Sequence, residues 1–239
     1  MTAELMIYAI IAAGLIFWLR SILGTRGEDD AQRPAIRLEL DDSGKVVNLD
    51  AVEKELDKSA LVAELAETPK DNMSIADKSV ETTLVDIAKI DREFDVYKFL
   101  RATQDAFVFI VESFADGDRE TLKDLLGEGV FKAFDGAIAA REKAGETMMA
   151  EIQSIQKSEI CEARLEGKTA LITVRFWAEE VSVTKDDNGE IVAGHPDKPT
   201  KMRDVWTFSR DLKSRDPRWF VVETREDGEG DHENIPNTH

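Results

Sequence analysis

The feature that most constrains this chain is an apolar run near its N-terminus, from Leu5 to Leu23, which carries a single charge at Arg20. Read as an α-helix with a rise of about 1.5 Å per residue, the run is roughly 28 Å long. That length is close to the hydrocarbon thickness of a bilayer, about 30 Å. The residues after Gly24 are polar or amphipathic. We therefore predict a transmembrane anchor over residues 1–24 that ties the rest of the chain to a membrane.

A cleaved secretory signal and a buried core helix are the two other interpretations of this run. A signal needs a positively charged start and a small-residue cleavage site, but no Lys or Arg precedes the run and bulky residues follow Trp18. A core helix that is apolar on all faces would be unusual before a polar linker. Trp18 and Arg20 instead suit a membrane–water interface. The anchor prediction rests on Leu5, Ile7, Ile10, Leu15, Phe17, Trp18 and Arg20.

The orientation of the anchor follows from its flanking positive charges. Arg20 and Arg26 lie on its C-terminal side, whereas only Glu4 precedes it. The positive-inside rule then places the C-terminal side in the cytoplasm, or in the matrix if the membrane is mitochondrial. Cys161 is the single cysteine of the chain, so no internal disulfide can form, which fits a reducing compartment.

The net charge of −18 limits the partners of the chain. Nucleic acid is disfavoured because phosphate binding depends on Lys and Arg. Broad docking onto anionic lipid is disfavoured for the same reason, although a local basic patch remains compatible with it. About 140 to 150 residues remain after the anchor and a linker, which is enough for one domain with its own core.

Residues 25–79 have the composition of a flexible acidic linker. They are rich in Asp, Glu and Lys, include Pro34 and Pro69, and contain no aromatic residue. Such a segment buries too little apolar surface to offset its ordering entropy. A short hairpin over 36–49 and a helix over 50–66 are the two structured segments that the pattern allows. Transient structure and a linear motif that orders on a partner both remain open for them.

From Val80 onward the pattern is that of a folded domain, predicted to span residues 80–224 and to be followed by a disordered tail over 225–239. Apolar residues at spacings of three and four predict helices first, and the spacing falls to two beyond Thr147. Met149 to Lys157 and Glu159 to Leu165 are the first two predicted strands. Gly117 suits a helix C-terminus and Asp118 a helix N-cap. The alternation of apolar and polar residues shifts by one position near Glu179 and Glu180, which indicates a β-bulge. We predict an α+β fold in which about three helices pack on a curved antiparallel sheet and form a cone with an apolar interior.

Four stretches within about residues 80–223 carry a resemblance to a known family. They are Phe94-Asp-Val-Tyr-Lys-Phe-Leu, Phe107 to Asp118, Leu122-Lys-Asp-Leu-Leu and Asp204-Val-Trp-Thr-Phe-Ser-Arg-Asp. With these stretches, the order of elements resembles the C-terminal domain of the Tim44-like family. Together with the anchor and the acidic linker, it is similar to the bacterial, TimA-type members, which are described as adaptor proteins.

The resemblance implies a nuclear-transport-factor-two-like cone with a large apolar pocket, at a bacterial inner (plasma) membrane. In the mitochondrial family this domain associates with the inner membrane and with cardiolipin, and the whole protein tethers a DnaK-class chaperone to the translocation channel. This chain departs from that pattern, because an anchor and an acidic linker stand where the chaperone- and channel-binding part lies. The resemblance therefore supports the role of a membrane-linked adaptor for this chain better than it supports chaperone tethering.

The residues offer little catalytic chemistry. None of the three histidines, His195, His232 and His239, has partners at a metal-ligand spacing, and neither a phosphate-binding loop nor a nucleophile elbow is present. Tyr97 is best interpreted as a helix-edge residue, and Asp204 as the partner of a nearby base such as Arg175 or Arg203.

The prediction for function is accordingly non-enzymatic, with no catalytic residue, cofactor or metal. The chain is expected to be an adaptor or scaffold that contacts membrane lipid and recruits membrane or chaperone proteins, which include protein-translocation components. The alternatives are a lipid- or hydrophobic-ligand-binding module and, less favoured, a pocket enzyme of the isomerase or dehydratase kind. Residues that fit an apolar pocket, or else ordinary core packing, are Phe107, Phe176, Trp206 and Phe208.

Overall fold

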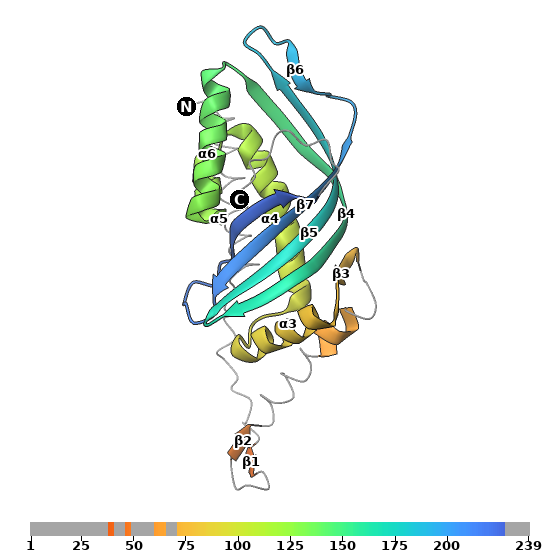
Figure 1. The fold of residues 1–239 in the computed structure, drawn as a ribbon, viewed down its shortest axis with the longest axis vertical. Coiled ribbons are helices and arrows are strands. Elements are labelled where there is room, and N and C mark those ends of the chain that lie inside the picture. The colour runs from red at the N-terminus through yellow and green to blue at the C-terminus, as the bar shows by residue number, and fades with distance from the viewer. Residues whose placement is uncertain (1–37, 41–45, 49–59, 66–70, 228–239) are drawn as a thin grey trace, which may run out of the picture.

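The computed structural model describes residues 38–40, 46–48, 60–65 and 71–227 (Figure 1). The anchor prediction and the predicted tail beyond 227 lie outside these residues. Within them, no helix has the length and apolar character needed to cross a membrane.

Four helices of the described part follow the apolar spacing of the sequence: α3 (Lys78–Ile90), α4 (Val96–Asp116), α5 (Arg119–Leu125) and α6 (Glu128–Lys143). Asp77, Asp95 and Asp118 cap the first three by accepting backbone N–H bonds, which satisfies donors that a helix start leaves open. Gly117 ends α4 with a positive φ of 72°, as its position in the sequence predicts.

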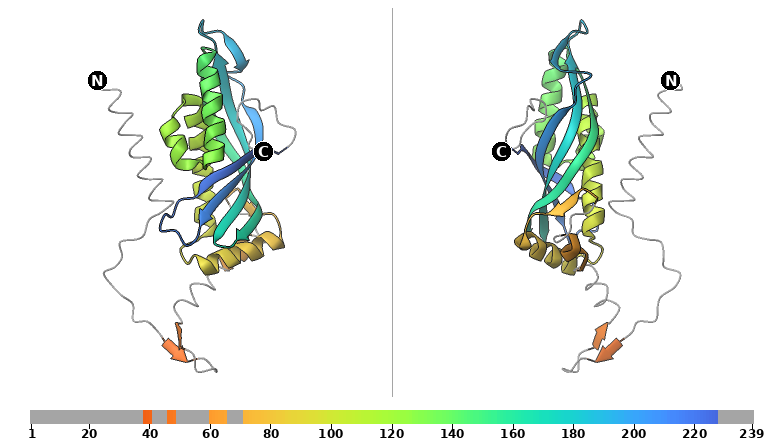
Figure 2. Two further views of the ribbon diagram at one scale, coloured as in Figure 1. Left: turned by 60° about the vertical axis from the view of Figure 1, so that its left-hand side comes forward. Right: turned by 90° about the vertical axis from the view of Figure 1, so that its right-hand side faces the viewer.

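The main sheet has six strands: β3 (Met73–Ile75), β4 (Thr147–Glu166), β5 (Thr169–Lys185), β6 (Ile191–Gly194), β7 (Thr200–Asp211) and β8 (Phe220–Glu226). Their order is β3-β4-β5-β7-β8, and β6 pairs with the end of β5. The sheet curves, and the helices lie on its concave side (Figure 2). The mixed α+β class with a curved sheet is therefore confirmed.

The sheet departs from the prediction in two respects. It is not wholly antiparallel, because β3 pairs with β4 in parallel. The region from Met149 to Leu165, expected as two strands, is part of the single strand β4, which has register shifts at three places. The bulge predicted near Glu179 and Glu180 is present, but the extra residue is Gln153 on β4, opposite those two residues of β5.

Ordered structure also begins earlier than residue 80. Residues 60–65 are helical, and β3 lies within the segment expected to be linker. Val62, Leu65, Met73 and Ile75 are buried in the main core. The hairpin predicted over 36–49 is present as β1 (Leu38–Leu40) paired with β2 (Val46–Asn48).

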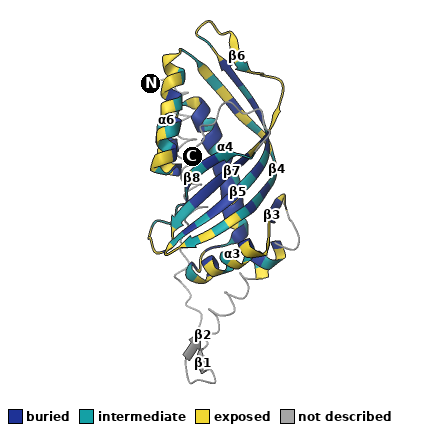
Figure 3. Cartoon of the chain, viewed as in Figure 1, coloured by how far each residue is buried: buried dark blue, intermediate teal, exposed yellow. Residues whose placement is uncertain are grey.

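The core lies between the concave face of the sheet and the helices, where Figure 3 shows the buried residues concentrated. Its centre is formed by α4 against β5 and β7. Large side chains with less than 2% exposure there include Phe107, Ile110, Phe176 and Trp206. This core fixes the position of every candidate site described below.

Candidate functional site

The four residues predicted to line an apolar pocket are brought together at the centre of the core. The Phe107 ring of α4 stacks on Phe176 of β5 with centroids 4.6 Å apart, and its centroid lies 4.8 Å from that of Trp206 on β7. Phe208 meets Phe99 edge-on at 6.0 Å. Exposure is 0% for the first three and 2% for Phe208.

These rings fill space rather than surround it. Phe208 lines a cavity of about 10 Å³ together with Phe99 and Trp219, which is room for about one water molecule. A ligand at this position would have to displace packed aromatic side chains. That the four rings form a ligand pocket stays a prediction, and retention of lipid by the full chain in native mass spectrometry, weakened by Trp206→Ala, would test it.

Two carboxyl groups lie on the concave face of the sheet, where apolar side chains are expected. Asp204 of β7 has 3% exposure and Glu180 of β5 has 4%. The expected pairing of Asp204 with Arg175 is wrong, because Arg175 bonds Glu159 and Asp227. Arg203 precedes Asp204 on the strand, so alternation turns it to the other face. In the sequence, the feature that points to Glu180 is the shift in the alternation of apolar and polar residues along β5. The shift puts an acidic residue at a position where a buried apolar residue is expected.

Burial raises the pKa of both carboxyl groups. The pKa of Glu180 rises to about 7 through desolvation. The pKa of Asp204 also rises to about 7, through desolvation first and then the nearby Glu226 and Glu180, while the Trp206 indole opposes the shift. Asp204 lies opposite Glu226 on β8, and its Oδ2 has no hydrogen-bond partner. This part of the core therefore changes charge near neutral pH.

The remaining ionisable candidates do not form a reactive group. The His195 backbone N–H donates to the Ser182 carbonyl, and its Nδ1 accepts from the Asp197 N–H, so its ring holds a loop. His232 and His239 lie outside the described residues. Burial raises the pKa of Tyr97 on α4 and that of the Cys161 thiol, which contacts the Thr173 carbonyl. Among the residues described, no set of three or more His, Cys, Asp or Glu is arranged to hold a metal ion.

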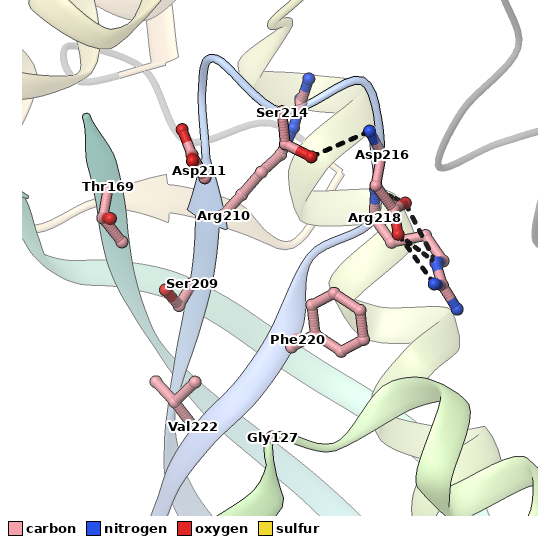
Figure 4. A pocket seen from close by; sticks show the side chains of 10 residues that line it. All are labelled: Gly127, Thr169, Ser209, Arg210, Asp211, Ser214, Asp216, Arg218, Phe220 and Val222. Carbon is pink, nitrogen blue, oxygen red and sulfur yellow. Dashed lines mark hydrogen bonds and ion pairs between the residues drawn. The ribbon is translucent and has the colours of Figure 1, made fainter.

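A surface cavity of about 430 Å³ lies beside the hairpin that joins β7 to β8 (Figure 4). Gly127 borders it and donates its backbone N–H to the Val221 carbonyl at 2.7 Å. Both arginines that line it are paired, Arg210 with Asp91 at 2.8 Å and Arg218 with Asp216 at 2.7 Å. The cavity therefore presents no unpaired cation to an anionic ligand. The lining residues are Gly127, Thr169, Ser209, Arg210, Asp211, Ser214, Asp216, Arg218, Phe220 and Val222.

A second cavity, of about 340 Å³, lies between the C-terminal half of α6 and the strands β4 and β5. We name it the α6 groove. The sequence does not predict this groove, because Ala137 and Ala140 give a weak apolar signal and Met148 and Thr184 come from the distant strands β4 and β5. The residues that line it are Phe114, Ala137, Ala140, Arg141, Glu146, Met148 and Thr184.

The family is decided by the extent of the sequence match. The Tim44-like domain model matches residues 80–226, which is more than half of the 239-residue chain. The chain belongs to the Tim44-like domain family. The predicted resemblance is thereby confirmed, over the same helices and strands that carried it.

Curated relatives of this Tim44-like chain are mitochondrial import proteins. The probable mitochondrial import inner membrane translocase subunit tin-44 of Caenorhabditis elegans is 26% identical over 60% of this chain and 35% of its own length. The human mitochondrial import inner membrane translocase subunit TIM44 is 26% identical over 56% of this chain and 30% of its own length. The Tim44-like chain thus spans about a third of the length of these relatives.

Among solved structures, the intermembrane space region of the chloroplast protein ARC6 aligns with 53% of this chain and 95% of its own, at 17% identity and a TM-score of 0.36. This similarity is too low to support an inference about fold or function.

Proposed function

We propose that this Tim44-like chain is a single-pass membrane adaptor without enzymatic activity, which recruits protein partners to the cytoplasmic face of a bacterial inner (plasma) membrane. The observation that carries the proposal is the family match over residues 80–226, whose relatives are named inner-membrane translocase subunits. The family match favours protein-translocation or chaperone components as the partners. The run from Leu5 to Leu23 is the proposed anchor.

The shape of the domain is part of the same proposal. A curved sheet with helices on its concave face, and a core between them, supports a cone of the nuclear-transport-factor-two-like type. Linker residues between the anchor and the domain would let the cone search the space near the membrane. Because residues 60–65 and β3 pack in the main core, the tether extends at most over residues 25–59. A flexible segment of about 35 residues has a root-mean-square reach of roughly 30 Å.

Proximity labelling in the native membrane tests recruitment. A biotin-ligase enzyme is fused to the C-terminus of the full chain, and the matched control carries the same enzyme after residues 1–59, which end before the first residues that pack in the core. Both share the anchor and the linker, so proteins labelled only by the full chain are recruited by the Tim44-like domain. We expect translocation or chaperone components in that difference. Identical labelled sets would contradict an adaptor role for the domain.

A separate measurement tests the anchor and its orientation. Ile10→Arg with Leu15→Arg puts two charges into the apolar run, which costs about 2.5–3.5 kcal/mol for each at the centre of a membrane helix. The variant should move from the membrane fraction to the supernatant after alkaline extraction. A reporter active only in the periplasm, fused to the C-terminus of the full chain, should stay silent, and activity there would reverse the orientation.

A further inference from the structure

A short strand from the segment before α3 covers part of one edge of the main sheet. β3 has three residues and pairs in parallel with Ser158 to Ile160 of β4, whereas the other strand pairs in the described part of the chain are antiparallel. In Figure 1 it lies beside β4 at the edge of the sheet. We name residues 71–76, which include β3, the strap.

The strap is seated through two apolar side chains. Met73 and Ile75 are both buried in the main core. Between them, Ser74 points to the opposite face, because side chains alternate along a strand. Its hydroxyl donates to the Glu159 carboxylate at 3.3 Å. The edge of β4 therefore receives an apolar residue, a small polar residue and a second apolar residue in turn.

Hydrogen bonds at an exposed position hold the start of the strap. The Asn72 side chain donates to the Ile155 carbonyl at 2.7 Å, and the Asn72 carbonyl accepts from the Ser158 N–H at 2.8 Å. Gln104 of α4 donates to the Asn72 side chain at 3.2 Å and to the Ser158 hydroxyl at 2.7 Å. Asn72 is exposed, so water can replace the bonds of its side chain when the strap lifts.

The backbone at the same point has an unfavourable conformation. Asp71 and Asn72 have positive φ angles of 49° and 59°, in the left-handed region. Asp and Asn enter this region more readily than most residues, but only Gly does so without steric cost. Backbone positions of this kind are common in segments that switch. The strap therefore leaves its place more readily than an unstrained segment with the same contacts would.

The strap covers only a small part of the edge that it occupies. β4 has 20 residues, and within the described sheet β3 is the strand paired with its outer edge. Ile152 and Ile155, nearer the start of β4, pack against the main core and are only partly buried. A longer extended segment would cover these two side chains as well as the residues that pair with the strap.

We propose that the strap occupies a binding site for another protein, and that the exposed edge of β4 binds an extended segment of that partner in the same parallel direction. This inference rests on the adaptor function proposed above and names how a partner would be held. The segment would carry apolar side chains at alternate positions, with a small polar one where Ser74 lies. Its backbone would bond the Ser158 N–H and the Ile160 carbonyl, as the strap does. Strand addition at a sheet edge is a common mode of peptide recognition.

The strap and the partner segment would compete for this edge. The helical residues 60–65 precede the strap and α3 follows it, so a lifted strap stays close to the site at high effective concentration. A partner segment gains over the strap by pairing with more of β4 and by needing no left-handed residues. The strap would then limit binding to segments that are long enough to cover Ile152 and Ile155.

Fluorescence anisotropy of the full chain in neutral detergent tests the site. One labelled peptide copies residues 71–78, and a second adds Val-Thr-Val-Thr before the same residues. The control for each has Ser in place of its Met and Ile. We expect the longer peptide to bind roughly tenfold more tightly than the shorter one, and both controls to lose binding. Equal binding of the longer peptide and its control would overturn the proposal.

A reversible lock shows whether the peptides use the edge beneath the strap. Ser74 and Glu159 are in register on adjacent strands, so Ser74→Cys with Glu159→Cys places two thiols within reach of a disulfide. Both changes are made in a Cys161→Ser chain, which leaves no other thiol. The oxidised chain should not bind either peptide, and reduction should restore binding. Equal binding before and after reduction would place the peptide elsewhere.

Substitutions in the strap change the competition without touching β4. Asn72→Ala removes the side-chain bonds and should tighten binding of the longer peptide by roughly tenfold. Asn188→Ala, in the exposed turn before β6, is the matched control and should leave binding unchanged. Asp71→Gly relieves the left-handed backbone and should weaken binding by roughly threefold. An Asn72→Ala chain that binds neither peptide would overturn the proposal.

The failure of this inference and that of the adaptor function give different results. Failure of the peptide measurements, together with proteins labelled by the full chain but not by residues 1–59, would overturn the strap inference alone. Identical labelled sets for these two fusions would contradict the adaptor function itself, whatever the peptides do.

Discussion

Phe107 of α4 stacks on Phe176 of β5 with ring centroids 4.6 Å apart and planes 21° apart. Neither side chain is exposed. Trp206 of β7 completes the contact at 4.8 Å from Phe107, so one helix side chain touches two neighbouring strands. This contact joins the helix layer to the sheet at the middle of the fold.

Phe107→Ala should therefore destabilise the domain strongly. Removal of a fully buried ring leaves a cavity that packed strands cannot close, and such changes cost about 3–5 kcal/mol in free energy of unfolding. Urea unfolding followed by tryptophan fluorescence measures this loss. Ile191→Ala, at a 48% exposed position, is the control and should change the free energy by less than about 0.5 kcal/mol. Similar losses for both variants would mean that the stacked rings are not central to stability.

The buried carboxyl groups of Asp204 and Glu180 predict an unusual pH dependence. Their pKa values of about 7 in the folded chain lie above the ordinary values of 3.8 and 4.5. The folded chain then binds more protons than the unfolded chain between about pH 4 and pH 7. Their contribution to stability is fully present below the ordinary values and is lost as pH rises through about 7. We expect the free energy of unfolding to fall between pH 5 and pH 8.

Asp204→Asn tests this sign directly. The amide resembles the protonated carboxyl, so the variant should be more stable than the parent chain at pH 8 by on the order of 2–4 kcal/mol and nearly unchanged at pH 5. Urea unfolding at both pH values measures the difference. Asp197→Asn, in an exposed loop, is the control and should show the pH dependence of the parent chain. A variant that is less stable at pH 8 would show that a charged Asp204 is favourable in the core.

Sequence reasoning located the helices, because their caps and apolar spacing are local. Asp118 caps α5 and Gly117 ends α4 where the pattern predicts. It placed Phe107, Phe176, Trp206 and Phe208 together, because all lie on inward faces, but spacing alone does not distinguish a filled core from a pocket.

What the sequence could not predict depends on contacts between distant segments. The strand β3 forms on the edge of β4, some eighty residues away in the chain, so its three residues carry no independent strand signal. The α6 groove likewise needs α6 beside β4 and β5. For Asp204 the sequence favours a basic partner, because a buried acid without one is uncommon.

Two glycines with positive φ give a matched test of close packing. Gly194 has φ of 75° and Gly167 has φ of 64°. A Cβ at Gly194 would collide with the Ser182 carbonyl, whereas a Cβ at Gly167 would meet nothing within 4 Å. Both alanine variants share the cost of the left-handed backbone, about 1 kcal/mol. Gly194→Ala should lower the melting temperature more than Gly167→Ala does. Equal decreases would mean that the backbone around β6 relaxes to make room for the added methyl group.

The start of the folded domain gives the last prediction. Val62, Leu65, Met73 and Ile75 are buried in the main core, although the composition of 25–79 predicts a linker. Each such side chain contributes about 1.5–3 kcal/mol when fully buried, and β3 also pairs with the β4 edge between Ser158 and Ile160. A chain that begins at residue 80 should therefore be several kcal/mol less stable than one that begins at residue 60. Thermal unfolding of the two forms compares them. Equal melting temperatures would show that residues 60–79 are dispensable, and would return the boundary of the domain to Val80.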